Sequence, residues 1–171
     1  MKEERITHPI PPEQDGQARI LILGSFPSVA SRKAAYFYGH PQNRFWRVLA
    51  AVFEDALPQT VEEKRAFLHR HHIALWDVIA SCRITGSADS SVREAEANDL
   101  RPILEQNPIG AIFVNGKTAE KYYKKLIYPT LGIPATCLPS TSPANAAVSL
   151  DRLIEAWRAI QKEKSPIERH S

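Results

Sequence analysis

Four short runs of apolar residues alternate along the chain with amphipathic segments. The runs cover residues 19–23, 73–76, 111–114 and 135–138, and each leads directly into a polar segment. Short apolar runs bounded by polar turns are typical of strands that are buried on both faces. Between and after them, helical spacing or helix-boundary residues predict helices over residues 44–53, 60–71, 98–106, 118–125 and 150–162. The alternation predicts a three-layer α/β/α fold with a central four-stranded parallel sheet.

The remaining segments carry few periodic apolar positions. We expect one domain over residues 1–171, with an irregular lead-in at residues 1–18 and a frayed tail at residues 165–171. Residues 25–42 and 78–96 are predicted to be long irregular connections. Thr60, followed three places on by Glu63, predicts a capping box, and Ser149 is predicted to cap the last helix.

The polar segments are the candidates for chemistry. The carboxyl ends of parallel strands open at one edge of a sheet, which is where open α/β sheets bind ligands. That edge would gather residues 24–28, Asp77, Asn115 and the loop at residues 139–145, beside the helix start at Asn43. Each has a structural alternative: an ordinary turn, a turn asparagine, a proline-rich loop, or a helix cap in the case of Asn43. The sequence around Lys117 lacks the glycine spacing of a phosphate-binding loop.

Composition narrows the class of protein. The chain has 171 residues and a net charge of +3, and no apolar run is long enough to cross a bilayer. Its two cysteines, Cys82 and Cys137, lack CxxC spacing, which favours a reduced cytoplasmic protein without a zinc site. His69, His71 and His72 are better explained by the end of a helix than by a metal. We expect no metal, no cofactor, no membrane partner and a monomer.

Several segments together resemble the uracil-DNA glycosylase superfamily. Residues 24–28 (GSFPS) resemble its first motif and residues 139–145 (PSTSPAN) its second, while residues 40–46 (HPQNRFW) are similar to a segment of the mismatch-specific branch. Phe26 stands where mismatch-specific enzymes carry a catalytic asparagine, and the aspartate of classical uracil enzymes is also absent from this motif. The chain therefore resembles the hypoxanthine-DNA glycosylase (DNA-deoxyinosine glycosylase) family.

The resemblance implies a fold, an activity and a site. It implies a monofunctional repair enzyme that flips deoxyinosine out of DNA and hydrolyses its N-glycosidic bond, with Asn43 as the catalytic residue and Asn115 recognising the base. Asn43 would hold a water and stabilise positive charge on the sugar. The other residues expected to contact the base are Ser25, Phe26, Tyr36 and Phe45. Those expected to contact DNA are Ser28, Arg44, Lys117, Ser140, Thr141, Ser142, Pro143 and Asn145.

Three other functions compete with this one. A uracil-preferring glycosylase would use the same site. A non-catalytic DNA-binding module would keep the cleft without the reaction. An esterase built on Ser25, Asp77 and His40 is disfavoured because no histidine occurs between His72 and His170, where such enzymes usually carry theirs.

Overall fold

The central sheet has the predicted strands. The computed structural model describes residues 4–84 and 92–162. Within them, β2 (Ile20–Gly24), β3 (Ile73–Asp77), β6 (Ala111–Asn115) and β7 (Thr136–Leu138) form a four-stranded parallel sheet in the order β3-β2-β6-β7. Every residue of β2 is buried, which explains its unbroken apolar sequence.

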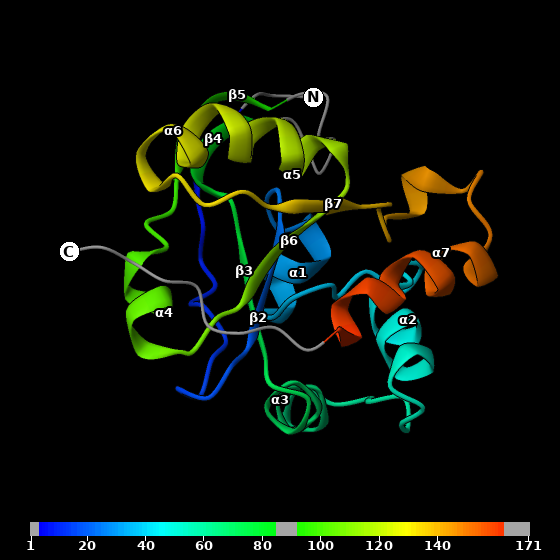
Figure 1. The fold of residues 1–171 in the computed structure, drawn as a ribbon. Helices are drawn as coiled ribbons and strands as arrows, with labels where there is room; N and C mark the ends of the chain where they lie inside the picture. The colour runs from blue at the N-terminus through cyan, green and yellow to red at the C-terminus, as the bar shows by residue number, and fades with distance from the viewer. Residues whose placement is uncertain (1–3, 85–91, 163–171) are drawn as a thin grey trace.

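Helices cover both faces of this sheet (Figure 1). Ile20 and Ile22 of β2 face a core shared with α2 (Phe45–Val52), α3 (Val61–Arg70) and α7 (Leu150–Trp157). Leu21 and Leu23 face the opposite core, which includes the next group of helices. That group comprises α4 (Arg101–Gln106), α5 (Lys117–Tyr122), a π-helical turn (Tyr123–Ile127) and α6 (Tyr128–Leu131). The α/β/α architecture is therefore confirmed.

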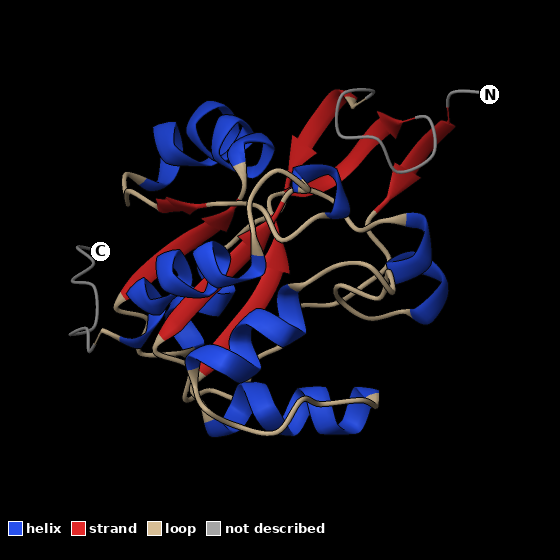
Figure 2. Cartoon of the chain, turned by 90° about the vertical axis from the view of Figure 1, so that its right-hand side faces the viewer, coloured by secondary structure: helices blue, strands red, loops and turns tan. Residues whose placement is uncertain are grey.

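A second sheet was not predicted. β1 (Glu4–Thr7), β4 (Ile79–Ile84) and β5 (Arg93–Ala97) form an antiparallel sheet in the order β1-β4-β5, beside the central sheet (Figure 2). The irregular assignments of residues 1–18 and 78–96 are thus wrong for these strands. Residues 85–91 and the predicted frayed tail lie outside the described part of the chain.

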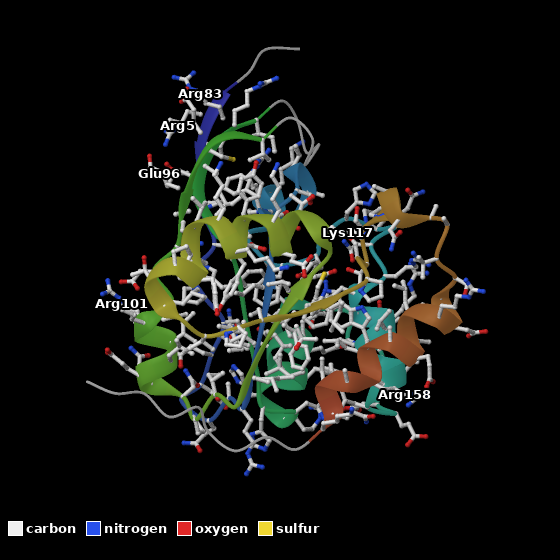
Figure 3. The ribbon with its side chains drawn as sticks, turned by 45° about the horizontal axis from the view of Figure 1, so that its top comes forward. Arg5, Arg83, Glu96, Arg101, Lys117 and Arg158 are labelled. Atoms are coloured by element: carbon white, nitrogen blue, oxygen red, sulfur yellow. The ribbon has the colours of Figure 1, made fainter. Side chains whose placement is uncertain are left out.

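The second sheet was missed because two of its strands, β1 and β5, carry mostly polar residues. In β5, charged residues alternate with alanine, and β1 is only four residues long. Charged side chains pair across its exposed face, where Arg5 bonds Glu96 and Arg83 bonds Glu94 (Figure 3). Its pairing depends on contacts between distant segments, which a local pattern does not reveal.

The helix boundaries differ modestly from expectation. Thr60 caps α3 by accepting a hydrogen bond from the Glu63 amide (3.0 Å), and Ser149 caps α7 in the same way. The Glu63 carboxylate returns to the amide of Gln59 rather than to that of Thr60. The predicted loop at residues 25–42 contains α1 (Val29–Ala34), which Ser28 caps. Two 3-10 turns, Pro143–Asn145 and Arg158–Gln161, complete the described helices.

Candidate active site

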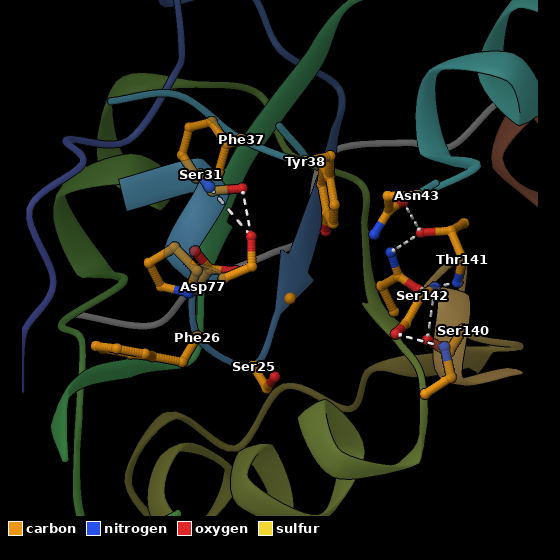
Figure 4. A pocket seen from close by; sticks show the side chains of 15 residues that line it. Ser25, Phe26, Ser31, Phe37, Tyr38, Asn43, Asp77, Ser140, Thr141 and Ser142 are labelled. Carbon is orange, nitrogen blue, oxygen red and sulfur yellow. Dashed lines mark hydrogen bonds between the residues drawn. The ribbon is translucent and has the colours of Figure 1, made fainter. Parts of the chain in front are cut away.

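A cavity of about 200 Å³ opens at the carboxyl edge of the central sheet (Figure 4). It is smaller than the roughly 300–1,000 Å³ of typical small-molecule sites, so it suits a single ring system better than a whole nucleotide. Its walls come from the ends of β2, β3 and β6, from the loop after β7, from α1 and the segments on either side of it, and from the start of α2. They are Gly24, Ser25, Phe26, Pro27, Ser28, Ser31, Phe37, Tyr38, Asn43, Asp77, Asn115, Ser140, Thr141, Ser142 and Ala144.

Thr141 links the two candidate asparagines inside this cavity. Its hydroxyl donates a hydrogen bond to Asn43 Oδ1 (2.8 Å) and accepts one from Asn115 Nδ2 (3.0 Å). Its backbone amide donates to Asn115 Oδ1 (3.1 Å), and the residue is fully buried. The three residues therefore form one hydrogen-bonded chain that fixes the orientation of both carboxamides. Thr141 is a bridge within the protein, and it is too buried for the DNA contact that the sequence suggested.

Asn43 also holds the start of α2. Its Oδ1 accepts a hydrogen bond from the Phe45 amide (2.9 Å), although Arg44 occupies the cap position itself. With Thr141, this gives the oxygen two donors. The amide group at Nδ2 has no acceptor within the described residues, and it points away from Thr141 in Figure 4. Asn43 is thus both a helix-start residue and a donor at the cavity wall.

Asp77 ends β3 and is held by a histidine from the N-terminal segment. Asp77 Oδ2 lies 2.7 Å from His8 Nε2, and the two side chains are 6% and 3% exposed. His8 Nδ1 accepts a hydrogen bond from the Ile10 amide (3.1 Å), so the ring hydrogen lies on Nε2 and is donated to Asp77. Both ring nitrogens are therefore occupied, which leaves His8 unable to serve Ser25 as a base. Asp77, the acid of the esterase alternative, is thus bonded to His8 and not to His40.

Tyr38 adds a hydroxyl that the sequence analysis missed. Its φ of 53° is a left-handed conformation that is uncommon for a tyrosine, and its ring stacks on Phe45 at 3.9 Å. The hydroxyl is buried without a hydrogen-bond partner in the described structure. Burial and the charge of Asp77 raise the pKa of Tyr38, while the nearby amide of Asn115 opposes the rise. The hydroxyl therefore keeps its proton and remains a donor.

Most residues predicted to contact a base line the cavity, but two do not. Ser25 and Phe26 are at its wall, with Asn43 and Asn115. Phe45 is fully buried beneath Tyr38. The hydroxyl of Tyr36 donates to Glu13 (3.0 Å) within the core. The expectation that Tyr36 or Phe45 faces a bound base does not match these positions, because their rings pack into the hydrophobic core.

Arg44 is half-buried and braces a loop. Its guanidinium donates to the carbonyls of Val148 (2.7 Å) and Asn145 (3.0 Å), and its amide donates to the carbonyl of Thr141. Asn145 Nδ2 in turn donates to the Ser140 carbonyl (2.9 Å). Two of the five guanidinium N–H donors thus hold the chain between Asn145 and Val148, and a DNA contact by Arg44 stays a prediction.

A wider groove adjoins the cavity. Its volume is about 950 Å³, and Ser140, Ser142 and Ala144 are common to both. Lys117 and Lys121 of α5 lie along it with Thr118 and Asn145. Ser28 lines only the smaller cavity, and Pro143 lines neither. The groove is the surface on which the remaining predicted DNA contacts come together.

Among residues 4–84 and 92–162, no three His, Cys, Asp or Glu side chains gather as a metal site would require. No helix in those ranges is long and apolar enough to span a membrane.

A small amide-lined cavity thus lies at the carboxyl edge of a parallel sheet, where α/β proteins bind their ligands, and its volume suits one ring system. The chain belongs to the uracil DNA glycosylase superfamily, whose family model matches residues 11–161. This family membership confirms the resemblance and the fold class.

The similarity to known proteins covers most of the chain. A protein of Methanosarcina acetivorans named hypoxanthine DNA glycosylase is 36% identical over 85% of this chain and 92% of its own length. A protein of the same name from Methanosarcina barkeri is 33% identical over 79% and 85%. The solution NMR structure of a Methanosarcina acetivorans protein, described provisionally as a uracil DNA glycosylase, superposes with a TM-score of 0.74. It is 31% identical, and the match covers 90% of this chain and 97% of that chain.

Proposed function

We propose that the protein is a monofunctional DNA glycosylase that hydrolyses the N-glycosidic bond of deaminated bases, with hypoxanthine in deoxyinosine as the main substrate. The single observation that carries the proposal is that Asn43 and Asn115, distant in sequence, line one base-sized cavity and are joined through Thr141. The names of the Methanosarcina relatives support the same substrate.

The target base must leave the duplex to enter this cavity. Flipping a nucleotide costs roughly a few kcal/mol, and least where the base is mismatched or damaged. Phe26 lies at the cavity wall and is the aromatic side chain placed to stack on the base, a contact worth about 1–3 kcal/mol. The loop at residues 139–145 and the adjoining groove would hold the DNA backbone.

Asn43 would act by positioning a water and not as a general base, because a carboxamide has no proton-accepting group of useful basicity. Its Oδ1 already accepts two hydrogen bonds, so Nδ2 is the group available to hold a water near the anomeric carbon. Such a water keeps a lone pair for attack on an oxocarbenium-like sugar, which requires little activation of the nucleophile. The departing base keeps the electrons of the broken N-glycosidic bond, and it takes up the proton that the water releases as its oxygen bonds to the anomeric carbon. None of the cavity-lining residues is a lysine, so the site offers no Schiff-base nucleophile and the strand would stay intact.

Asn115 would bind the edge of the base. One of its Nδ2 hydrogens and its Oδ1 are bonded to Thr141, and the second Nδ2 hydrogen can donate to a base carbonyl. Asn115 as a whole is 9% exposed. Binding a base here would therefore complete its hydrogen bonding without breaking the link to Thr141.

The test compares base release from duplexes carrying one deoxyinosine or one deoxyuridine, followed by alkali to cut abasic sites. We expect inosine release by the wild-type protein and a loss of about 10²–10³-fold in Asn43→Ala, in the range found when one preorganised polar group is removed. Gln42→Ala, an exposed amide beside it, is the control and should retain full activity.

Other outcomes select other functions. Uracil release that exceeds inosine release would make the protein a uracil-preferring glycosylase. Binding to abasic DNA without release of any base would make it a DNA-binding module. Unchanged inosine release by Asn43→Ala would remove Asn43 from the mechanism. A monomeric state and a cytoplasmic location remain predictions from the sequence.

A further inference from the structure

Asp77 presents an oxygen to the cavity that the mechanism above does not use. Oδ2 accepts the Nε2 hydrogen of His8, whereas Oδ1 has no hydrogen-bond donor within the described residues. Gly24 makes room for it: a Cβ on Gly24 would collide with Asp77 Oδ1 and would lie 3.1 Å from the Tyr38 hydroxyl. The two oxygens therefore border the same small space.

These oxygens have opposite hydrogen-bonding character. Asp77 Oδ1 belongs to a carboxylate and accepts hydrogen bonds, while the Tyr38 hydroxyl is a buried donor without a partner. A buried polar group without a partner costs free energy, which favours a ligand that satisfies it. The second Nδ2 hydrogen of Asn115 is another donor on this wall. The cavity thus offers a hydrogen-bond acceptor, Asp77 Oδ1, beside two hydrogen-bond donors, the Tyr38 hydroxyl and Asn115 Nδ2.

Deamination produces the complementary pattern on a base. Hypoxanthine carries a ring N1–H donor next to its O6 acceptor, and uracil carries N3–H next to O4. Adenine has the reverse, an unprotonated N1 next to an amino group, as cytosine does at N3 and N4. A carboxylate facing N1 of adenine would place two acceptors against each other, which is unfavourable.

We propose that Asp77 is the residue that selects deaminated bases, by accepting a hydrogen bond from the ring N–H adjacent to the new carbonyl, while Tyr38 donates to that carbonyl. This inference rests on the proposed glycosylase function and specifies its substrate class as bases with an N–H beside a carbonyl. Guanine and thymine share that edge, so their rejection depends on the cost of extruding them from a matched pair.

The bond between His8 and Asp77 makes one substitution especially informative. His8 can only donate from Nε2, because its Nδ1 accepts the Ile10 amide. In Asp77→Asn, the amide oxygen would therefore face His8 and the amide NH₂ would face the cavity. The substitution conserves size and converts the acceptor into a donor.

The experiment measures single-turnover release from duplexes carrying deoxyinosine or deoxynebularine, whose purine base has neither N1–H nor O6. Each variant is compared with the wild-type protein on the same substrate, so differences in bond lability cancel. We expect Asp77→Asn to lower inosine release about 100-fold and to leave nebularine release unchanged or raise it. Asp99→Asn, an exposed aspartate paired with Arg101, should change neither rate.

Two outcomes would overturn the inference: unchanged inosine release by Asp77→Asn, or an equal fall on both substrates in a protein that is folded. Tyr38→Phe provides a second variant that deletes the donor alone. It should lower inosine release about 10-fold and spare nebularine, and an equal effect on both would remove Tyr38 from base recognition.

Binding of free bases separates this inference from the proposed function. Calorimetric titration with hypoxanthine and with unsubstituted purine requires no catalysis. Wild-type protein should bind hypoxanthine more tightly than purine, and Asp77→Asn should reverse that order. If the wild-type protein released no base from DNA yet showed this reversal, the glycosylase function would fail and the role of Asp77 would stand. Equal binding of both bases by the wild-type protein would refute the role of Asp77.

Discussion

Thr141 is the residue on which the site geometry depends most. It is fully buried and makes three hydrogen bonds to the two asparagines. Within the described residues Asn43 and Asn115 are each hydrogen-bonded to Thr141 and not to one another, so the threonine sets their relative positions. A residue in a serine- and proline-rich loop thereby acts as an internal spacer between two carboxamides.

Replacing Thr141 with valine tests this role. Thr141→Val keeps the shape but leaves Asn115 Nδ2 without its acceptor and Asn43 Oδ1 without one of its donors. We expect a loss of about 1–3 kcal/mol in the free energy of unfolding, measured by urea denaturation. We also expect single-turnover inosine release to fall about 10–100-fold while the Kd for DNA changes little.

Thr141→Ser is the matched control, since it restores the hydroxyl without the methyl group. It should recover most of the rate even if some stability is lost through the missing methyl contacts. The contrary result is a rate of inosine release that falls in proportion to the free energy of unfolding in both variants, whether or not the hydroxyl is present. That result would show that Thr141 only supports the fold.

At the scale of secondary structure, the central sheet could be predicted because strands buried on both faces have a recognisable apolar sequence. A strand such as β2, with helices on both faces, reads as an unbroken apolar run. The strands of the second sheet have no unbroken apolar run of this kind. In β5 the sequence REAEA alternates charge with alanine, and its pairing with β4 is irregular in register. Its strands depend on partners elsewhere in the chain, which local patterns do not identify.

The site was predictable to the extent that it follows from topology. The carboxyl ends of β2, β3 and β6 had to meet, so Ser25, Asp77 and Asn115 were expected at one edge, and all three line the cavity. Side-chain direction could not be predicted in the same way. Arg44 follows a candidate residue and carries a charge, yet it turns toward the carbonyls of the neighbouring loop.

Asp55, in the loop that joins α2 to α3, forms an ion cluster with the C-terminal end of α3, and this cluster has a predictable response to acid. Asp55 accepts hydrogen bonds from His71 Nε2 (2.7 Å) and from two nitrogens of Arg70 (3.0 and 2.8 Å). These bonds, that of His71 foremost, lower the pKa of Asp55 to about 2. A carboxylate with a lowered pKa stabilises the folded protein above its ordinary pKa, and this contribution is lost as the pH falls toward about 2.

Asp55→Asn should therefore lower Tm at pH 7, and the gap from the wild-type protein should close as the pH falls from about 4 toward 2. The measurement is a series of thermal melts of both proteins across that range. Asp99→Asn serves as the comparison, because Asp99 also has a lowered pKa but pairs only with the exposed Arg101. A gap that stayed constant down to pH 2 would contradict the assignment to the Asp55 carboxylate.

At the scale of the whole molecule, the proposed function gives the two cavities different roles. The smaller one lies at the carboxyl edge of the sheet and would take the base, while the wider groove beside it carries Lys117 and Lys121. Ser140 and Ser142 form the wall between them. A DNA backbone lying in the groove would pass the mouth of the cavity, so the lysines would contribute to holding DNA and not to cleaving the bond.

The salt dependence of DNA binding tests this division. Each lysine that neutralises a phosphate contributes about −0.9 to the slope of log K against log salt. Lys117→Gln and Lys121→Gln should each make the slope shallower by about one, weaken binding to all sequences alike, and leave single-turnover inosine release at saturating protein unchanged. Lys124→Gln is the control, because Lys124 pairs with Glu120 and does not line the groove. Equal slopes for all three variants and the wild-type protein would place the DNA backbone on another face. A loss of rate at saturation would mean that a lysine of α5 reaches the flipped nucleotide, and the separation of binding from chemistry would then be wrong.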